Sequence, residues 1–416
     1  GKFDLENHFF SSTEELLDNL AALKLFNETI LIKGARSFGF ERVSKALTQK
    51  VHETVLEVNL NALENNLNFY KNHLQPGVKQ MAMVKAFSYG SGSFEIANLL
   101  QFNKIDYLAV AYADEGVALR QAGITLPIMV MSPDVLAFDV MIANNLEPEI
   151  YNFRILKEFV EVLNTKNLEN YPVHIKFDTG MHRLGFDAGE VQELCRMLMD
   201  TSALKVQSVF SHLVASDDAA HDEFTNQQLS EFNEVCRILQ QELDYTFIRH
   251  IANTSAISRW GDAQFDMVRL GIGLYGIDSA YPETKPMQPV ATLKTIISQI
   301  RPVQAGDTVG YSRRGKMPAD GKIATVKIGY ADGYRRALGN GRGKMLVNGK
   351  KVPTIGNICM DMCMLDITGV NAAEGDEVIV FNDEITVEAL ARQCDTIPYE
   401  ILTGISQRVK RVYFYE

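Results

Sequence analysis

Eight short apolar segments, separated mostly by amphipathic helical stretches, recur along the middle of this 416-residue chain. Strands that alternate with helices pair in parallel and are buried on both faces, so they read as continuous apolar runs. Eight such units favour a parallel (β/α)₈ barrel of the TIM type, with an open doubly wound sheet as the structural alternative. The segments are QMAMVK, YLAVAY, PIMVMS, EPEIYN, VHIKFD, VQSVFSHL, FIRHIAN and FDMVRLG.

The first part of the chain follows a different pattern. Ser12 and Glu15 form a capping-box sequence ahead of a helix, TILIKG (29–34) is typical of a buried strand, and FERVSKALTQK (40–50) predicts a second helix. One strand and two helices are too few to bury a core of their own. We therefore predict that residues 1–50 are a remnant or linker attached to a barrel over residues 51–290.

The last part of the chain reads as a smaller, mostly-β domain over residues 291–416. Short apolar segments are punctuated there by glycine, and Asn348-Gly349 between two such segments is a strong hairpin signal. A single late helix is predicted near TVEALARQC (386–394). The overall fold class is thus α/β, with a barrel followed by a β-rich domain.

Composition narrows the possible partners. A formal net charge of −11 argues against nucleic acid and against anionic membranes as binding partners. No apolar stretch approaches the roughly 20 residues that a membrane helix needs. The five cysteines are scattered and odd in number, which suits a reducing cytoplasm better than a disulfide framework.

Two motifs suggest functions that their surroundings exclude. GIGLYG (271–276) satisfies G-x-G-x-x-G, but the proline-containing sequence after it cannot supply the helix that a dinucleotide site requires. Cys359 and Cys363 lack the second pair or nearby histidine that would complete four metal ligands. We predict neither a dinucleotide site nor a metal site.

Lys85 ends the first barrel segment, in MVKAFSYGSG (83–92). The ordinary explanation is a lysine whose charged end reaches solvent from a strand end. The functional alternative is a Schiff-base lysine, because burial lowers the pKa of an amine and makes it nucleophilic.

Further polar residues follow the ends of other predicted strands. Each alone has an ordinary explanation, for example a surface ion pair for Arg183 or a hydrogen-bonded core histidine for His212. In a parallel barrel these positions all lie at the carboxyl-terminal face, where active sites are built, so together with Lys85 they indicate one shared site. The residues are Lys176, Arg183, His212, Asn253, Thr254 and Arg269.

Nine segments together, in order from about residue 54 to 416, resemble the pyridoxal-phosphate-dependent alanine racemases. They are MVKAFSYGSG, KFDTGMHRLG, FSHL, HIANTSA, DMVRLGIGLYG, GYSRRG, GYADGYRR, GNICMDMCMLDI and PYEILTGISQRVKRVY. The resemblance implies interconversion of L- and D-alanine for peptidoglycan synthesis by a two-base mechanism. It also implies pyridoxal 5′-phosphate as cofactor and a homodimer with active sites shared between subunits.

The resemblance implies a role for each candidate residue. Lys85 carries the cofactor and is one base, Tyr311 of the partner subunit is the other, His212 orients this tyrosine, and Arg269 faces the pyridine nitrogen. The remaining implied cofactor contacts are Tyr89, Asn253, Thr254, Gly271, Ile272 and Tyr399, and the implied substrate contacts are Arg183, Met360, Asp361 and Tyr330.

Lys176 matches a lysine that is carbamylated in many relatives. A carbamate would pair with Arg183, whereas an ammonium pointing the same way would repel it. We favour the carbamate, and the ordinary alternative is an unmodified lysine bonded to a carboxylate such as Asp178.

Several readings stay open at this point. The same scaffold could serve a broader amino-acid or serine racemase, a non-catalytic pyridoxal-phosphate-binding barrel protein, or a basic-amino-acid decarboxylase, although Tyr311 does not fit the last two. Sequence departures from the racemase pattern include Phe87 and Asn357. Residues 1–50 resemble the carboxyl-terminal tail of a Mur ligase, which implies a ligase half fused at the amino-terminal side.

Overall fold

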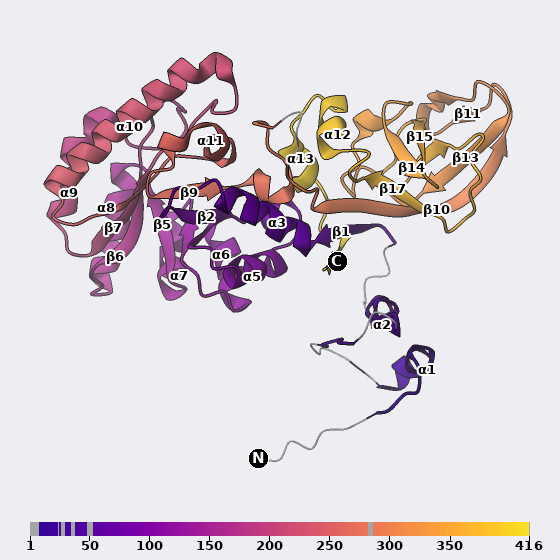
Figure 1. The fold of residues 1–416 in the computed structure, drawn as a ribbon, viewed down its shortest axis with the longest axis horizontal. Helices are drawn as coiled ribbons and strands as arrows, with labels where there is room; N and C mark the ends of the chain where they lie inside the picture. The colour runs from indigo at the N-terminus through magenta and orange to yellow at the C-terminus, as the bar shows by residue number, and fades with distance from the viewer. Residues whose placement is uncertain are drawn as a thin grey trace. The chain divides into compact units, whose positions relative to one another are not determined.

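The structure is a computed structural model that describes residues 8–23, 25, 30–34, 38–47, 53–281 and 286–415. The chain divides into two compact units, residues 1–53 and 54–416. The amino-terminal unit contains α1 (Thr13–Asn19), η1 (Leu20–Leu23) and α2 (Phe40–Leu47), drawn in indigo in Figure 1.

Local contacts explain the helices of the amino-terminal unit. The Ser12 hydroxyl caps α1 by accepting from the Glu15 N–H at 3.1 Å, as the sequence predicts. The strand predicted at residues 29–34 is wrong for residues 30–34, which have no strand, and Leu31 is 85% exposed. A strand needs a neighbour to pair its backbone groups, and the described part of this unit offers none.

Eight parallel strands form the first domain of the larger unit, in the spatial order β8-β7-β6-β5-β4-β3-β2-β9. Two backbone hydrogen bonds join the segments of the two outer strands, so the sheet closes. The Asp266 N–H donates to Arg249 O at 3.1 Å, and the Arg269 N–H donates to Ala252 O at 2.9 Å. The predicted barrel is confirmed. Its strands are β2 (Lys79–Met83), β3 (Tyr107–Val110), β4 (Ile128–Val130), β5 (Leu146–Ile150), β6 (Tyr171–Lys176), β7 (Leu204–Phe210), β8 (Ile248–His250) and β9 (Met267–Leu270).

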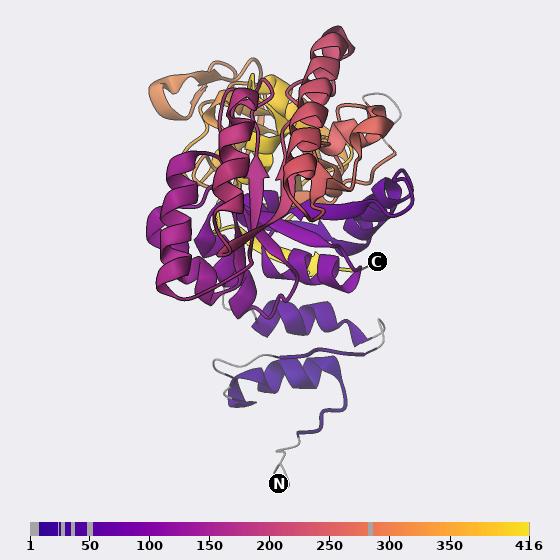
Figure 2. The ribbon, with the colours of Figure 1, turned by 90° about the vertical axis from the view of Figure 1, so that its left-hand side faces the viewer.

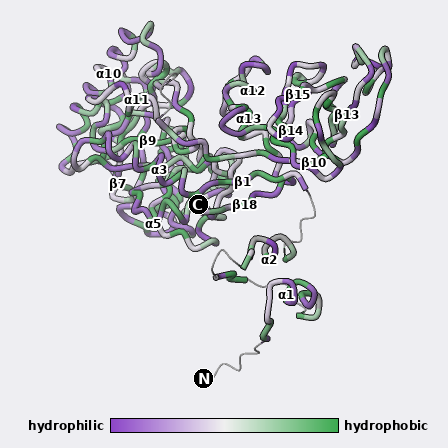
Figure 3. Tube along the Cα trace, turned by 45° about the vertical axis from the view of Figure 1, so that its right-hand side comes forward, coloured by the Kyte–Doolittle hydropathy of each residue, from purple (hydrophilic) through white to green (hydrophobic). Residues whose placement is uncertain are grey.

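Amphipathic helices lie around the outside of these strands (Figure 2). In α8, for example, four apolar residues at helical spacing are buried: Ile155, Leu156, Phe159 and Leu163. Along the long helix α10, most residues are hydrophilic (Figure 3). The helices are α3 (Leu60–Lys71), α5 (Phe94–Phe102), α6 (Ala113–Gln121), α7 (Phe138–Ala143), α8 (Phe153–Thr165), α9 (Val191–Met199), α10 (Asp222–Glu242) and α11 (Thr254–Arg259). Short 3₁₀ turns are η3 (Val135–Ala137), η4 (Ala188–Glu190), η5 (Ala219–His221), η6 (Gly261–Ala263) and η7 (Ile272–Tyr275).

The second domain is mostly β, as predicted. Asn348 and Gly349 form the predicted hairpin turn, with φ angles of 47° and 75°, between β14 and β15. Its strands are β10 (Ala291–Val303), β11 (Thr308–Val309), β12 (Gly315–Lys316), β13 (Gly321–Val326), β14 (Lys344–Val347), β15 (Lys350–Ile355), β16 (Cys363–Asp366), β17 (Glu377–Phe381) and β18 (Lys410–Phe414). Its helices are η8 (Tyr311–Arg313), η9 (Arg336–Leu338), α12 (Val387–Gln393) and α13 (Pro398–Thr403).

β1 (Val55–Asn59) precedes the barrel in sequence but lies in the sheet of the β domain. It pairs antiparallel with β10 and parallel with β18. Alternate residues of β1 are buried, which is the pattern of a strand covered on one face, whereas β3 and β9 are buried throughout. The prediction of a barrel that begins at residue 51 therefore needs correction at this strand.

A truncation separates the two units experimentally. We expect a chain that starts at Thr54 to keep the activity that the resemblance implies within a few-fold of the full chain, because the candidate site residues all belong to the second unit. A chain that starts at Leu60 is the control: it lacks β1, which joins β10 to β18, and we expect it to fail to fold. Loss of activity in a folded chain that starts at Thr54 would contradict this separation.

Candidate active site

The candidate residues gather at the carboxyl-terminal ends of the barrel strands. Lys85 follows β2, Lys176 is the last residue of β6, and His212 follows β7. Thr254 follows β8 and Gly271 follows β9. Because parallel strands end at the same face of a barrel, five separate stretches of sequence contribute to one site.

Lys85 opens α4 (Lys85–Tyr89), a turn with an unusual backbone. Ala86, Phe87, Ser88 and Tyr89 all have positive φ, between 47° and 56°, a conformation that costs non-glycine residues roughly 1–2 kcal/mol each. Contacts from elsewhere hold the turn: the Ala86 N–H donates to Glu115 Oε1 at 2.6 Å, and Arg411 Nε donates to Gly90 O at 2.9 Å. Such imposed strain fixes the position of the lysine beside it.

Lys85 is half-buried, and its pKa is lowered. Burial is the main cause, and the charges of Arg183 and Lys176 add to it, while Glu115 and Glu149 act in the opposite direction. A lowered pKa increases the fraction of free amine, the form that attacks a carbonyl or accepts a proton.

Arg269 lies in β9 with 3% of its surface exposed, and burial lowers its pKa to about 10. Its Nη1 donates to His250 Nδ1 at 2.8 Å and to His250 O at 3.2 Å. Its Nη2 donates to Ser211 O at 2.6 Å, Ile251 O at 3.0 Å and His212 Nδ1 at 3.4 Å. The Nε–H is therefore the donor that these contacts leave for a ligand.

A buried chain of hydrogen bonds continues from Arg269 across the barrel interior. His250 Nε2 lies 2.8 Å from Ser208 Oγ, Ser208 Oγ lies 2.6 Å from His174 Nδ1, and His174 Nε2 lies 2.8 Å from Glu147 Oε2. An arginine only donates, so each group must donate to the next in the direction of Glu147. This order makes His250 a neutral imidazole, in agreement with a pKa that burial and the charge of Arg269 lower well below its usual value.

Removing the Ser208 hydroxyl tests this chain. We expect Ser208→Ala to lower the urea midpoint of unfolding, because each buried histidine would lose a partner at a cost of about 1–3 kcal/mol. The activity that the resemblance implies should fall as well, since Arg269 would lose an anchored neighbour. The exposed Ser202, in the loop before β7, provides the control variant Ser202→Ala. Equal unfolding midpoints for the two variants would show that the chain does not stabilise the barrel.

A second group of residues forms a compact cradle beside Gly271. The Gly271 N–H donates to Thr254 Oγ1 at 3.0 Å, and a Cβ atom on Gly271 would lie 3.0 Å from the Tyr89 hydroxyl. The Tyr89 ring packs against Tyr399 with centroids 5.7 Å apart. Ile272 opens a helical turn that does not use its N–H. Hydroxyls and backbone N–H groups in this arrangement suit a phosphate.

Asn253 has a structural role in the present geometry. Its Oδ1 accepts from the Ala256 N–H at 3.0 Å and from Ser216 Oγ at 2.8 Å, and its Nδ2 donates to Leu213 O at 3.4 Å. It therefore caps α11 and positions Thr254, the first residue of that helix.

Lys176 is almost fully buried and donates to Glu149 Oε1 at 3.0 Å. Asp178, the partner considered from sequence, instead accepts from the N–H groups of Gly180 and Met181, both at 2.8 Å. Burial raises the pKa of Glu149 to about 7, although the charges of Lys176, Arg183 and Arg269 act in the opposite direction. Arg183 is exposed, and its charge lowers the pKa of both Lys85 and His212.

The structure places the remaining candidates in the β domain, and there they are exposed. Tyr311 is 69% exposed, Tyr330 44% and Met360 54%, and Asp361 accepts from Arg408 Nη2 at 2.7 Å. Figure 1 shows β11 at the end of the β domain away from the barrel, and Tyr311 follows β11 by two residues. Within one chain, the strand that precedes Tyr311 therefore lies away from the barrel, which holds Lys85.

Asn357, a departure that the sequence left without explanation, has a clear position. Its Nδ2 donates to the backbone oxygen of Tyr311 at 3.0 Å, and its Oδ1 accepts from Asn340 Nδ2 at 3.0 Å. Asn357 thus fixes the backbone of the tyrosine rather than its ring.

Phe87, the other departure from the family pattern, lies in the turn after Lys85. Its ring centroid lies 5.3 Å from the Cζ atom of the Arg411 guanidinium, and this contact helps to hold the turn.

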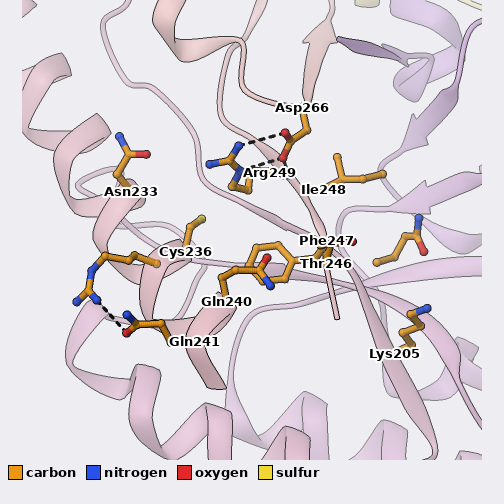
Figure 4. Close-up of a pocket in the computed structure, with 12 residues that line it drawn as sticks. Lys205, Asn233, Cys236, Gln240, Gln241, Thr246, Phe247, Ile248, Arg249 and Asp266 are labelled. Atoms are coloured by element: carbon orange, nitrogen blue, oxygen red, sulfur yellow. Dashed lines mark hydrogen bonds and ion pairs between the residues drawn. The ribbon is translucent and has the colours of Figure 1, made fainter. Parts of the chain in front are cut away.

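A surface cavity lies at the opposite end of the barrel. It has a volume of about 1080 Å³ and is bounded by Lys205 at the start of β7, Ile248 at the start of β8 and Asp266 before β9 (Figure 4). An ion pair between Arg249 and Asp266, at 2.9 Å, lies in its wall. The cavity contains none of the predicted site residues, so it is not the candidate site.

No group of histidine, cysteine, aspartate and glutamate side chains in the described part of the chain is arranged to hold a metal ion. None of the helices in residues that the structure describes has the length and apolar character needed to cross a lipid bilayer.

Comparison with known proteins identifies the family. The family model described as alanine racemase, N-terminal domain, matches residues 58–279, and the corresponding C-terminal domain model matches residues 290–413. Alanine racemase 2 of Caldanaerobacter subterraneus subsp. tengcongensis is 35% identical over 382 residues, which covers 88% of this chain and 96% of that protein. Alanine racemase of Clostridium tetani is 36% identical over 372 residues, which covers 86% of this chain and 94% of that protein.

Solved structures agree with this result. Alanine racemase of Clostridium difficile 630 superposes with a TM-score of 0.82 at 35% identity, covering 88% of this chain and 96% of that one. Alanine racemase of Bartonella henselae, solved with covalently bound pyridoxal phosphate, gives a TM-score of 0.80 at 30% identity, covering 87% of this chain and 99% of that one. The chain belongs to the alanine racemase family.

Proposed function

We propose that this protein interconverts L-alanine and D-alanine with pyridoxal 5′-phosphate as cofactor and so supplies D-alanine for peptidoglycan synthesis. The observation that carries the proposal is one barrel end that combines three features: an amine of lowered pKa, a buried arginine whose Nε–H is left by its contacts to described residues, and a cradle of hydroxyls and backbone N–H groups. The family supports the same reaction.

The residues present fit the cofactor. Lys85 Nζ would hold it covalently, and the Tyr89, Thr254 and Tyr399 hydroxyls with the Gly271–Ile272 backbone would hold its phosphate. The Nε–H of Arg269 would meet the pyridine nitrogen, and a guanidinium with a pKa of about 10 does not give up its proton there. When bound, pyridoxal phosphate withdraws electrons from the substrate α-carbon and makes its proton acidic.

Racemisation needs a base on each face of the α-carbon. Lys85 serves one face, where its amine removes the proton of D-alanine or delivers one to form it. The second face requires another group, and Tyr311 is our proposal for it, taking the proton from L-alanine. Arg183, Met360, Asp361 and Tyr330 are the proposed contacts to the substrate.

Tyr311 would come from a second copy of the chain. In its own chain it follows β11, which lies at the end of the β domain away from the barrel, and it is exposed, as are Tyr330, Met360 and Met362. Several exposed aromatic and sulfur-containing side chains in one domain are typical of a surface that a partner covers. We therefore propose a homodimer in which each active site joins the barrel of one subunit to the β domain of the other.

His212 is suited to orient the incoming tyrosine. It accepts from Arg269 through Nδ1, so its Nε2 carries the proton and can donate to a phenolate oxygen. Burial and the nearby charges of Arg269, Arg183 and Lys176 lower the pKa of His212 well below its usual value and keep the ring neutral. Such a donor stabilises a phenolate, whose ordinary pKa of about 10 is too high for a base at neutral pH.

Two finer points belong to the same proposal. All five cysteines are free, which supports action in the cytoplasm. Residues 1–53 form a unit of their own, which supports a tethering or docking role for the segment that resembles a Mur ligase tail.

A direct assay tests the function. Purified protein with pyridoxal phosphate and L-alanine should form D-alanine until the two enantiomers are equal, and L-serine in a parallel assay should react more slowly. Borohydride reduction before digestion should leave the cofactor attached to the peptide that contains Lys85. Absence of D-alanine formation by a protein that binds the cofactor would refute the proposal.

A further inference from the structure

The buried pair of Glu149 and Lys176 has no part in the reaction as described so far. Glu149 is the second-last residue of β5 and is fully buried. Its Oε1 accepts one hydrogen bond, from Lys176 Nζ. Its Oε2 is also buried and has no hydrogen-bond partner among the described residues. A carboxylate kept in a barrel interior with one oxygen unpartnered requires an explanation.

The surroundings of Lys176 favour a cation. Its Nζ donates to the Glu149 carboxylate at 3.0 Å and lies 5.5 Å from the centroid of the Phe210 ring. The Arg269 guanidinium approaches the same ring at 5.3 Å. The face of an aromatic ring attracts cations and repels anions. An anion at the end of Lys176 would meet both the ring and the Glu149 carboxylate unfavourably.

We propose that Lys176 stays an unmodified ammonium in this protein and that Glu149 supplies, from within the fold, the negative charge that balances Lys176 and Arg183 beside Lys85. This inference deepens the proposed function, on which it rests, and it replaces the carbamate expected for Lys176 from sequence. Glu149 is in this sense a positioning residue, because it acts on the site through two cations.

The chemistry of carbamylation explains why the pair prevents it. The free amine of a lysine attacks the carbon of carbon dioxide, a C–N bond forms, one C=O electron pair moves to oxygen, and the nitrogen releases a proton to solvent. Only the neutral amine can react, and the Glu149 carboxylate stabilises the ammonium. Without this carboxylate, Lys176 would lose the partner of its one hydrogen bond to a carboxylate, and its amine would be open to carbon dioxide.

The test compares the parent protein with Glu149→Gln at pH 8, above the pKa of Glu149, in carbon-dioxide-free buffer and with ¹³C-labelled bicarbonate. Carbamates are detected by ¹³C NMR and by chemical ethylation followed by peptide mass spectrometry, neither of which needs racemase activity. For the parent we expect no carbamate on Lys176 and no effect of bicarbonate on activity. For Glu149→Gln we expect a carbamate on Lys176 and an activity that bicarbonate raises several-fold.

Two controls separate this role from a general loss of charge or stability. Glu147→Gln removes a carboxylate from the same strand that binds His174 instead of Lys176, so it should not make activity depend on bicarbonate. Glu149→Asp keeps the carboxylate, should leave Lys176 unmodified, and serves if Glu149→Gln does not fold. A carbamate on Lys176 of the parent would overturn the inference, as would a folded Glu149→Gln variant with unmodified Lys176 in bicarbonate. Absence of racemase activity in the parent would instead refute the proposed function.

Discussion

Lys85→Ala is expected to lower racemase activity by about 10⁴-fold or more, because the variant loses both the covalent link to the cofactor and the base on one face. The cradle of Tyr89, Thr254 and Gly271 does not depend on the lysine side chain, so the variant should still bind pyridoxal phosphate noncovalently. Activity is measured as D-alanine formation, and the covalent link as cofactor retained on protein after borohydride reduction.

Lys79→Ala is the matched control for this variant. Lys79 begins the same strand, β2, and is exposed at its other end, so its removal should leave both readouts unchanged. Most of the activity remaining in Lys85→Ala, or cofactor fixed by borohydride to another lysine, would contradict the assignment of Lys85.

Tyr311→Phe is expected to act on one direction of proton transfer. The variant keeps the ring but lacks the hydroxyl, so the α-proton of L-alanine should exchange with deuterated solvent about 10²–10⁴-fold more slowly. The α-proton of D-alanine should still exchange, because Lys85 serves that face. NMR of each enantiomer in deuterium oxide measures the two rates separately.

Tyr415→Phe serves as the comparison, since Tyr415 is an exposed tyrosine that has no part in the proposed site. If Tyr311→Phe slowed both enantiomers equally, the tyrosine would be supporting the structure of the site rather than acting as the second base. If it slowed neither, another group would have to serve the second face.

Most of the fold follows from patterns that the sequence displays directly. The eight barrel strands are apolar because both faces are buried, and the predicted segments match β2 to β9 one for one. β1 was the difficult strand, because its residues 55–59 alternate and its partners β10 and β18 lie more than 230 residues away. The strand predicted at 29–34 failed for a related reason, since strand propensity cannot show whether a partner exists.

The site was predictable only where a residue stood at a strand end or in a motif. Glu147, His174, Ser208 and His250 were missed because they belong to the apolar strand segments themselves, where a polar residue is unexpected. The sequence did carry a signal for them, because residues two apart in a strand lie on the same face of the sheet. Glu147 therefore shares a face with Glu149, and His174 with Lys176. Which faces point into the barrel, and which residues meet there, depends on strand register across the whole sheet.

The central claim is that one active site takes Lys85 from one subunit and Tyr311 from the other. Separately purified Lys85→Ala and Tyr311→Phe proteins should each be nearly inactive. After the subunits are allowed to exchange in a mixture, racemase activity should return, because a heterodimer then holds one site with both residues intact. Activity that stays absent, although exchange is demonstrated with differently tagged subunits, would contradict a site shared between subunits.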